Sequence, residues 1–254
     1  PLTSTRYPRN RVEVRGGGGD TAVYRLLKAV DTEKDQTYFL HTLTQKELSK
    51  AMFPVGGLTK VEVREIARSL GLSTAEKAES FDICFIPRKD YRAFVTTRAG
   101  AAEEGDIVDV SGAVLGRHAG LRNYTLGQRE GLGLSTGAPM FGISMDRTKN
   151  HLGVGDRHDA LSTRFSVRNV TWTRDSPSPA RSGGEDGRRP GEGGSPVDVK
   201  VRHRAKTATA KVSTLENGNV VVDLLEPQFA PAPGQSAVFY RGDEVLGGGI
   251  ITRS

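Results

Sequence analysis

The stretch VDVKVRHRAKTATAKVSTLENGNVVVDLL, residues 197–225, contains the pattern that decides the fold of the C-terminal third of the chain. In its first eight residues, three valines alternate with mainly charged side chains, which predicts a β-strand with one buried face and one cationic face. The apolar face holds Val197, Val199 and Val201, and the cationic face holds Lys200, Arg202 and Arg204. Two further alternating segments, TATAKVSTL and NVVVDLL, are joined at Asn217-Gly218, a dipeptide typical of tight turns.

Downstream, SAVFYRGDEVLGGGII adds two more alternating segments around the turn Arg241-Gly242-Asp243. Several short strands with tight turns between them predict a small antiparallel β-barrel or sandwich. The cationic strand face has two interpretations that the pattern leaves open. Charges on an edge strand block aggregation, and a cationic face also suits a nucleic-acid surface.

A segment rich in Gly, Pro and Ser separates this region from the residues before it. In DSPSPARSGGEDGRRPGEGGSP, residues 175–196, fourteen of the 22 residues are Gly, Pro or Ser, which predicts a flexible insertion. Its charges sum to −1 while the whole chain carries +6, so the excess of basic residues belongs to the remaining parts of the chain. Further upstream, GDIVDVSGAVLG, residues 105–116, predicts a hairpin that turns at Ser111-Gly112.

The first hundred residues favour helices. Two segments begin with a capping box, in which Thr precedes Glu by three positions: Thr44 with Glu47, and Thr59 with Glu62. The first box predicts a helix over QKELSKAMF that ends before Pro54. The second predicts a helix that ends at Gly71 and has one apolar face: Val63, Ile66, Ala67 and Leu70. Pro87 suits the first turn of a third helix, RKDYRAFV.

The glycine-rich stretch VEVRGGGGDTAVYRLLKA, residues 12–29, allows two interpretations. Backbone amides of a glycine loop at a helix N-terminus can hold a phosphate group. However, VEV is too short and too polar for the buried parallel strand that precedes such loops, and AVYRLLKAV fits a return strand. We therefore predict a hairpin turn rather than a phosphate site.

Composition limits the function classes. The chain has 254 residues, of which 36% are apolar, and no apolar run approaches the roughly 20 residues that a membrane helix needs. The N-terminus shows no signal-peptide pattern. A single cysteine excludes an internal disulfide, which is typical of the cytoplasm. Together with the short apolar runs, it leads us to expect a cytoplasmic protein that does not enter a membrane. The five histidines show no metal-binding spacing, and no metal site is predicted.

The only cysteine, Cys84, lies in AESFDICFIP, residues 78–87. Its apolar neighbours suit a buried cysteine, which is the commoner state of this residue. A reactive thiol requires a lowered pKa, because an unperturbed thiol is only about 3% ionised at pH 7. The helix start near Pro87, together with Arg88 and Lys89, could supply that shift. A hydrolase in which His118 acts as the base for Cys84 is a third interpretation.

Four segments occur in an order that resembles the bacterial tRNA-specific 2-thiouridylases. They are KDQTYFLHTLTQKELSKAMFPVGGLTKVEVREIARSLGL, SFDICFI, YTLGQREGLGL and PGQSAVFYRGDEVLGGGI. The likeness runs from Tyr24 to Ile251 and is interrupted by the insertion at 175–196. Enzymes of this family replace the oxygen at C2 of the wobble uridine in certain tRNAs with sulfur.

The resemblance implies a mechanism. An N-terminal adenylating domain of the family uses ATP and Mg²⁺ to activate the uridine carbonyl as an adenylate, and the family's main ATP loop and its second cysteine have no counterpart in this sequence. Cys84 corresponds to the cysteine that carries a persulfide received from a sulfur-relay protein. A persulfide is more acidic and more nucleophilic than a thiol, which suits attack on the activated carbon. Without that adenylating domain, the chain is expected to have no thiolation activity of its own.

The resemblance also implies six residues that contact tRNA: Lys34, Asp35, Gln36, Arg202, His203 and Gln235. The first three match a Lys-Asp-Gln motif, and the next two align with an Arg-Tyr pair. His203 replaces the tyrosine but keeps a ring that can stack on RNA. Thr5 and Arg6 stand where the family has a Gly that contacts ATP and a His that contacts tRNA, so they depart from the family pattern.

These observations predict an α+β multidomain protein with three parts. Residues 1–98 form the helical C-terminal part of an adenylating α/β domain, residues 99–160 a small central β domain, and residues 161–254 an antiparallel β-barrel with the insertion at 175–196. The predicted function is transfer of persulfide sulfur from Cys84 to C2 of an ATP-activated wobble uridine in tRNA. The alternative is a tRNA-binding remnant of that enzyme without catalytic activity.

Overall fold

The computed structural model describes residues 12–16, 22–77, 94, 96–98, 100, 102–173 and 196–252. The chain divides into two compact units. Unit 1 comprises residues 1–77, 163–226 and 233–254, and unit 2 comprises residues 78–162 and 227–232. Most of the helix predicted after Pro87 and nearly all of the predicted insertion at 175–196 lie outside the described residues.

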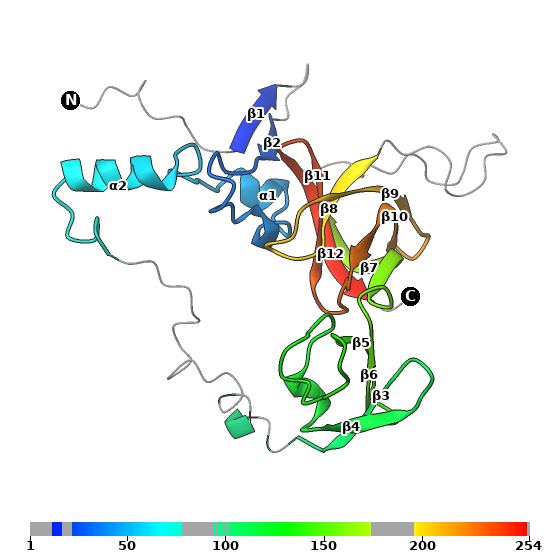
Figure 1. Ribbon diagram of the computed structural model, residues 1–254. Helices are drawn as coiled ribbons and strands as arrows, with labels where there is room; N and C mark the ends of the chain where they lie inside the picture. Colours follow the sequence, from blue (N-terminus) through cyan, green and yellow to red (C-terminus); the bar gives the residue numbers. More distant parts are fainter. Residues whose placement is uncertain are drawn as a thin grey trace, which may run out of the picture. The chain divides into compact units, whose positions relative to one another are not determined.

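Six strands close into a barrel, and all of their residues except the start of one strand and the end of another fall in unit 1 (Figure 1). They are β7 (Leu161–Trp172), β8 (Val197–Lys200), β9 (Ala208–Thr214), β10 (Val220–Phe229), β11 (Ser236–Arg241) and β12 (Glu244–Thr252). Their order around the barrel is β10-β7-β12-β11-β8-β9. Val199 of β8 lies opposite Phe239 of β11 in an antiparallel pairing, and Val222 of β10 lies opposite Val212 of β9 in another. The prediction of a C-terminal antiparallel barrel is confirmed.

Alternate side chains of these strands form one apolar core. Its buried members include Phe165, Val197, Val199, Val212, Val220, Val222 and Phe239. Burial of one such side chain stabilises a fold by roughly 1.5–3 kcal/mol. Two predicted turns are also present, because Gly218 and Gly242 have φ angles of +77° and +59°, which glycine adopts without strain.

Strand β8 ends at Lys200, so the prediction that it continues through Arg204 is wrong. Residues 201–207 leave the barrel wall as a turn, in which the Ala205 amide donates to the Arg202 carbonyl at 3.1 Å. Val201 remains buried in the barrel core, so the apolar side of the pattern extends one position beyond the strand. This turn contacts another segment of unit 1 through His203.

The other described residues of unit 1 form a hairpin and three short helices. The hairpin pairs β1 (Val12–Gly16) with β2 (Ala22–Leu26) in antiparallel register, with Val14 opposite Tyr24. This pairing confirms the prediction of a return strand. The helices are η1 (Thr37–Phe39), α1 (Gln45–Leu48) and α2 (Lys60–Ser69).

Both predicted capping boxes are present. The Thr59 amide donates to the Glu62 carboxylate at 2.7 Å at the start of α2. The Thr44 amide donates to Glu47 in the same way at 2.9 Å at the start of α1. Helix α1 is nevertheless shorter than predicted, because the chain leaves the helix after Leu48 and Phe53 packs against the adjoining apolar cluster. The caps thus determine where each helix begins, while tertiary packing sets the end of α1.

The hairpin and helices of unit 1 pack against the barrel strands. A second apolar cluster joins the two, with Leu26, Tyr38 and Leu48 against Val238, Tyr240 and Val245. Arg25 of β2 forms an ion pair with Glu244 of β12 at 2.7 Å, and the Glu244 side chain is only 4% exposed. Removing one partner from such a buried pair is strongly destabilising, which ties β2 to the barrel.

Unit 2 contains a four-stranded sheet with the order β4-β3-β6-β5. Its strands are β3 (Gly105–Val108), β4 (Val114–His118), β5 (Phe141–Asp146) and β6 (His151–Gly155). Strand β3 pairs antiparallel with β4, as the hairpin prediction requires, and parallel with β6. Ile107, Leu152 and Val154 form the centre of its core. The predicted α+β multidomain class is confirmed.

Candidate nucleic-acid interface

Two loops of unit 1 that are distant in the sequence contact each other. The Asp35 loop, residues 31–39, lies between β2 and α1 and includes η1, and the His203 loop, residues 201–207, connects β8 with β9. The His203 Nε2 atom lies 3.2 Å from the backbone oxygen of Asp35, 168 positions away in the sequence. A carbonyl only accepts hydrogen bonds, so Nε2 carries the proton and donates. The two loops contain five of the six predicted tRNA-contacting residues.

The Asp35 loop is built around the carboxylate of Asp35, which is only 6% exposed. Its Oδ1 accepts hydrogen bonds from the Ala29 amide at 3.0 Å and the Thr37 amide at 3.3 Å, and its Oδ2 accepts from the Thr37 hydroxyl at 2.7 Å. The side chains of Lys34 and Gln36 are exposed on either side. Asp35 therefore shapes the loop, and its neighbours present their side chains to solvent.

Three aromatic rings pack where the loops meet. The ring centroids of Phe39 and His203 lie 4.7 Å apart with planes inclined by 38°. The Tyr38 and Phe39 rings are nearly perpendicular, with centroids 5.3 Å apart and planes inclined by 87°, and the Tyr38 hydroxyl donates to the Ser236 carbonyl at 2.8 Å. Tyr38 is buried, whereas Phe39 is 58% exposed. The cluster thus has one ring anchored to the barrel and one that faces solvent.

Arg202 adds a partly buried cation beside these rings. Burial lowers the pKa of its guanidinium, which the neighbouring Tyr38 opposes. An arginine stays protonated at neutral pH even so. A cation that is partly shielded from water interacts more strongly with an incoming anion. Gln235, the sixth predicted tRNA contact, directly precedes Ser236, which binds Tyr38 and His41.

A shallow groove of about 390 Å³ runs along the two loops. It is lined by Lys28, Thr32, Asp35, Lys200, Ala205, Lys206 and Thr207. Lys28 is held in place, because its Nζ donates to the Gly242 carbonyl at 2.8 Å and lies 4.6 Å from the centre of the Tyr240 ring. The one acidic residue in the lining is Asp35, whose carboxylate is bonded within its own loop. The groove therefore presents three lysines, which suits a phosphate backbone.

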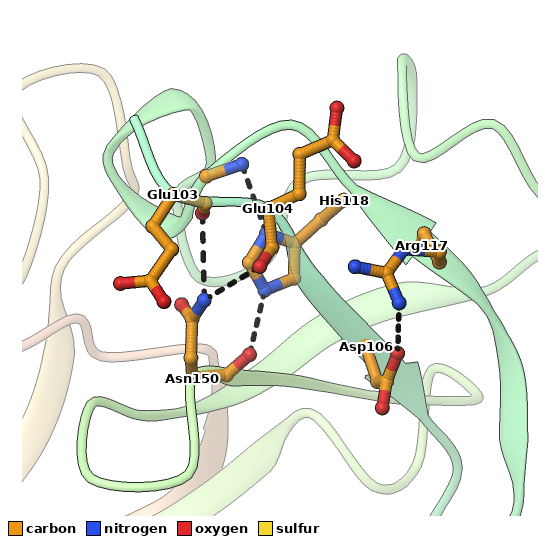
Figure 2. A network of polar contacts seen from close by, with 7 residues as sticks. Glu103, Glu104, Asp106, Arg117, His118 and Asn150 are labelled. Carbon is orange, nitrogen blue, oxygen red and sulfur yellow. Dashed lines mark hydrogen bonds and ion pairs between the residues drawn. The ribbon is translucent and has the colours of Figure 1, made fainter. Parts of the chain in front are cut away.

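His118, the residue considered as a base for Cys84, is a structural residue of unit 2 (Figure 2). It is 1% exposed, and both ring nitrogens are engaged. Nδ1 accepts from the Gly120 amide at 3.0 Å, and Nε2 donates to the Asn150 carbonyl at 2.9 Å. Neither nitrogen is left to accept a proton from a thiol, so the hydrolase interpretation has no base.

Three predicted site residues, Cys84, Thr5 and Arg6, lie outside the described residues. Within the described ranges, no group of three or more His, Cys, Asp or Glu side chains is arranged to hold a metal ion. In the same ranges, none of the helices combines the length and the apolar character needed to cross a membrane.

Sequence analysis did not single out Lys28 or Phe39 as surface residues. Lys28 lies in an apolar segment that predicted a strand, and an aromatic pair such as Tyr38-Phe39 next to a short helix is more often part of a core. The only signal in the sequence was the position of Phe39, three residues after the predicted contact Gln36. Its exposure depends on where the His203 loop lies, which local sequence does not encode.

Three family models match the chain in succession. The tRNA methyl transferase HUP domain matches residues 2–88, and the tRNA methyl transferase PRC-barrel domain matches residues 92–156. The aminomethyltransferase β-barrel domain matches residues 162–251. The Asp35 loop falls in the first match and the His203 loop in the third.

Curated relatives carry the name tRNA-specific 2-thiouridylase MnmA. That of Chloroflexus aurantiacus is 44% identical over 236 residues, which cover 92% of this chain and 62% of the relative. The protein of Solibacter usitatus is 44% identical over 240 residues, with 91% and 61% covered. The protein of Chlorobium chlorochromatii is 40% identical over 232 residues, with 90% and 61% covered. The chain thus spans 61–62% of the length of these relatives.

Proposed function

Because the chain belongs to the tRNA-specific 2-thiouridylase family, we propose that it takes part in the 2-thiolation of a uridine in tRNA. In this proposal the Asp35 and His203 loops bind the RNA, and Cys84 carries the sulfur. The observation that carries the proposal is the contact between the two loops, because it gathers residues from two distant segments along one cationic groove.

Electrostatics support RNA binding at this groove. Lys28, Lys200 and Lys206 line it, and Lys34 and Arg202 lie on the same two loops. Phosphate contacts made by such residues release counterions from the RNA, so the binding is expected to weaken steeply with salt. The carboxylate of Asp35 is the one acid in the lining, so the three lysines outnumber it.

The proposed chemistry at Cys84 is transfer of a sulfane sulfur. A persulfide on a donor protein passes its outer sulfur to the Cys84 thiolate, which leaves a thiol on the donor and a persulfide on Cys84. The outer sulfur attacks C2 of a uridine whose O2 has been adenylated, and AMP departs with that oxygen. A second thiol then attacks Sγ of Cys84, the S–S bond breaks, and 2-thiouridine leaves while the two thiols form a disulfide. Cys84 is the only cysteine in these 254 residues, so the second thiol lies elsewhere.

ATP and Mg²⁺ belong to the activation step of this proposal. The described residues contain no group of three or more His, Cys, Asp or Glu side chains placed to hold a metal ion. Adenylation is assigned instead to the adenylating domain that the family implies. The protein partners of the proposal are that domain and a sulfur-relay donor.

The role of Cys84 is tested by its rate of persulfide formation. We expect a persulfidated donor protein to label Cys84 faster than it labels a free model thiol at the same concentration, because a carrier thiol needs a lowered pKa. The label is read by mass spectrometry of the peptide that contains Cys84, and the Cys84→Ser variant is the control. Labelling no faster than that of the model thiol would favour the alternative, a tRNA-binding remnant without catalytic activity.

The need for an adenylating domain is a separate question. We expect the chain alone, mixed with ATP, an unmodified tRNA and a persulfide donor, to form no 2-thiouridine. Adding the adenylating domain of a relative is expected to produce it, with nucleoside mass spectrometry as the measurement. Product formed by the chain alone would refute this requirement.

A further inference from the structure

Phe39 is a large apolar side chain that stays 58% exposed on a loop lining a cationic groove. The ring is nevertheless held in place. The centroid of the ring lies 4.7 Å from that of His203 and 5.3 Å from that of Tyr38, whose plane is inclined to it by 87°. His203 is in turn fixed by its hydrogen bond to the Asp35 carbonyl. The remaining surface of the ring faces solvent in a defined orientation.

Sites for single-stranded nucleic acid combine a cationic groove with aromatic rings, and both features occur at these loops. The lysines of the groove bind the backbone, and the ring offers a face on which a base can stack. Each such stacked base strengthens binding by about 5-fold to 150-fold. Because Phe39 is already ordered by His203 and Tyr38, little side-chain entropy is lost when a base stacks on it.

We infer that the exposed face of Phe39 stacks an unpaired nucleobase of the RNA whose backbone lies in the adjacent groove. This inference rests on the proposed function and adds to it a contact of a different kind. The six residues implied by the family resemblance are polar or ring nitrogen-bearing side chains, whereas Phe39 contributes a purely apolar face. The ring distinguishes an unpaired base from a paired one, because bases inside a helix stack on their own neighbours.

The surroundings of Phe39 favour RNA over a protein as the occupant. The centre of a protein–protein interface is apolar and depleted in lysine. The exposed side chains of the two loops include Lys34, Gln36, Arg204 and Lys206, with Glu33 as the exposed acid among the residues described there. A single ring framed by cations matches a polyanion that also carries flat apolar bases.

The test compares an RNA that has unpaired bases with one that has none. Dissociation constants are measured by fluorescence anisotropy for an unmodified tRNA transcript and for a fully paired RNA duplex, over a series of salt concentrations. The variants of the full chain are Phe39→Ala and Phe39→Trp. Leu215→Ala is the matched control, because Leu215 is an apolar side chain, 44% exposed, at the turn between β9 and β10. Thermal unfolding checks that each variant is folded.

We expect Phe39→Ala to weaken tRNA binding by about 5-fold to 150-fold and to leave duplex binding unchanged. The salt dependence should stay the same, because stacking releases no counterions. Phe39→Trp should retain the affinity for tRNA, and Leu215→Ala should match the unaltered chain on both RNAs.

Three possible results distinguish a failure of the stacking inference from a failure of the proposed function. Equal tRNA affinity for Phe39→Ala and the unaltered chain would overturn the stacking inference while leaving RNA binding intact. An equal loss on tRNA and on duplex would also overturn it, because Phe39 would then act by shaping the loops. An unaltered chain that binds no tRNA would contradict the proposed function itself.

Discussion

The two units of the protein each contain a histidine that donates from Nε2 to a backbone carbonyl, yet the two residues serve different purposes. His203 donates to Asp35 at 3.2 Å, and His118 donates to Asn150 at 2.9 Å. His118 is 1% exposed and accepts a second bond at Nδ1, whereas His203 is partly exposed and packs on an exposed phenylalanine. The same type of hydrogen bond therefore fixes a buried histidine in unit 2 and joins two surface loops in unit 1.

This comparison shows what distinguishes a residue of a candidate binding site from a buried residue with a structural role. Residue type and hydrogen-bond geometry are nearly the same in the two places. The surroundings differ. His203 lies on a loop that lines a groove with three lysines, whereas His118 is buried at the end of β4. If the difference in surroundings is also a difference in role, substitutions at the two places should affect different properties of the protein.

The largest expected effect is on stability, at His118. We expect His118→Ala to lower the free energy of unfolding of unit 2 by about 2–4 kcal/mol, because it leaves the Asn150 carbonyl and the Gly120 amide without their partner. Urea unfolding measures this. The neighbouring Arg117→Ala is the control, because Arg117 forms an exposed ion pair with Asp106 and its loss should cost less than about 1 kcal/mol (Figure 2). An equal decrease in the free energy of unfolding for the two variants would show that the hydrogen bonds of His118 do not stabilise unit 2.

The next effect is on RNA affinity, at the cations of the two loops. We expect Arg202→Ala to weaken tRNA binding more than Lys34→Ala does, because Arg202 is partly buried and Lys34 is exposed. Each variant should also reduce the slope of log affinity against log salt by about 0.9 for each phosphate that the variant no longer neutralises. A salt titration of tRNA binding provides both numbers.

Arg168→Ala is the control for these two variants. Arg168 is an exposed arginine on β7, which lies three strands from β8 in either direction around the barrel. Its removal should change tRNA affinity and salt dependence little. If Arg168→Ala weakens binding as much as Arg202→Ala, the RNA contacts the barrel through general charge and the two loops have no special role.

A smaller effect is expected from the hydrogen bond between the loops. His203→Phe keeps a ring against Phe39 but removes the donor to the Asp35 carbonyl. Loss of one such bond costs roughly 0.5–1.5 kcal/mol, so tRNA affinity should fall by a few-fold while the barrel itself stays folded. The measurements are tRNA binding and urea unfolding. If the His203→Phe variant binds tRNA as tightly as the unaltered chain, the hydrogen bond between the loops does not contribute to tRNA binding.

The smallest effect is a pH dependence that comes from His41. Burial lowers the pKa of this side chain, which is 5% exposed and lies 3.0 Å from the Ser236 hydroxyl. The unfolded chain therefore takes up a proton more readily than the folded one. The stability that this group contributes is complete above the unfolded pKa of about 6.5 and is lost as the pH falls towards the lowered folded pKa.

The His41→Gln variant isolates this contribution, because carboxylates elsewhere in the chain also change stability in acid. We expect urea unfolding of the variant to depend less on pH between about 7.5 and about 5.5 than that of the unaltered chain. Equal slopes for the two proteins would mean that His41 does not titrate on unfolding in this range.

Local sequence predicted much of the fold because the relevant interactions are local. The alternation of valines predicted the barrel strands, the two Thr–Glu pairs predicted where α1 and α2 begin, and Ser111-Gly112 predicted the hairpin of unit 2. The ends of α1 and β8 were not predicted. Both depend on contacts with distant segments, namely the packing of Phe53 and the bond of His203 to Asp35.

The charge alternation of residues 197–204 allowed a nucleic-acid surface as one of two interpretations, whereas the residues of the Asp35 loop were indicated only by the family resemblance. The resemblance pointed to Lys34, Asp35, Arg202 and His203 one at a time, and nothing in their spacing indicated that their loops touch. It also gave no sign that the carboxylate of Asp35 is buried or that Phe39 is exposed. Burial is decided by which segments pack together, and here those segments are 168 positions apart.

Ultraviolet cross-linking of the chain to an unmodified tRNA, followed by mass spectrometry of the linked peptides, tests the RNA-binding surface most directly. We predict that the cross-linked peptides include those containing Phe39 and His203, and that excess unlabelled tRNA abolishes the signal. Cross-links confined to unit 2, with neither loop labelled, would contradict the assignment of this surface.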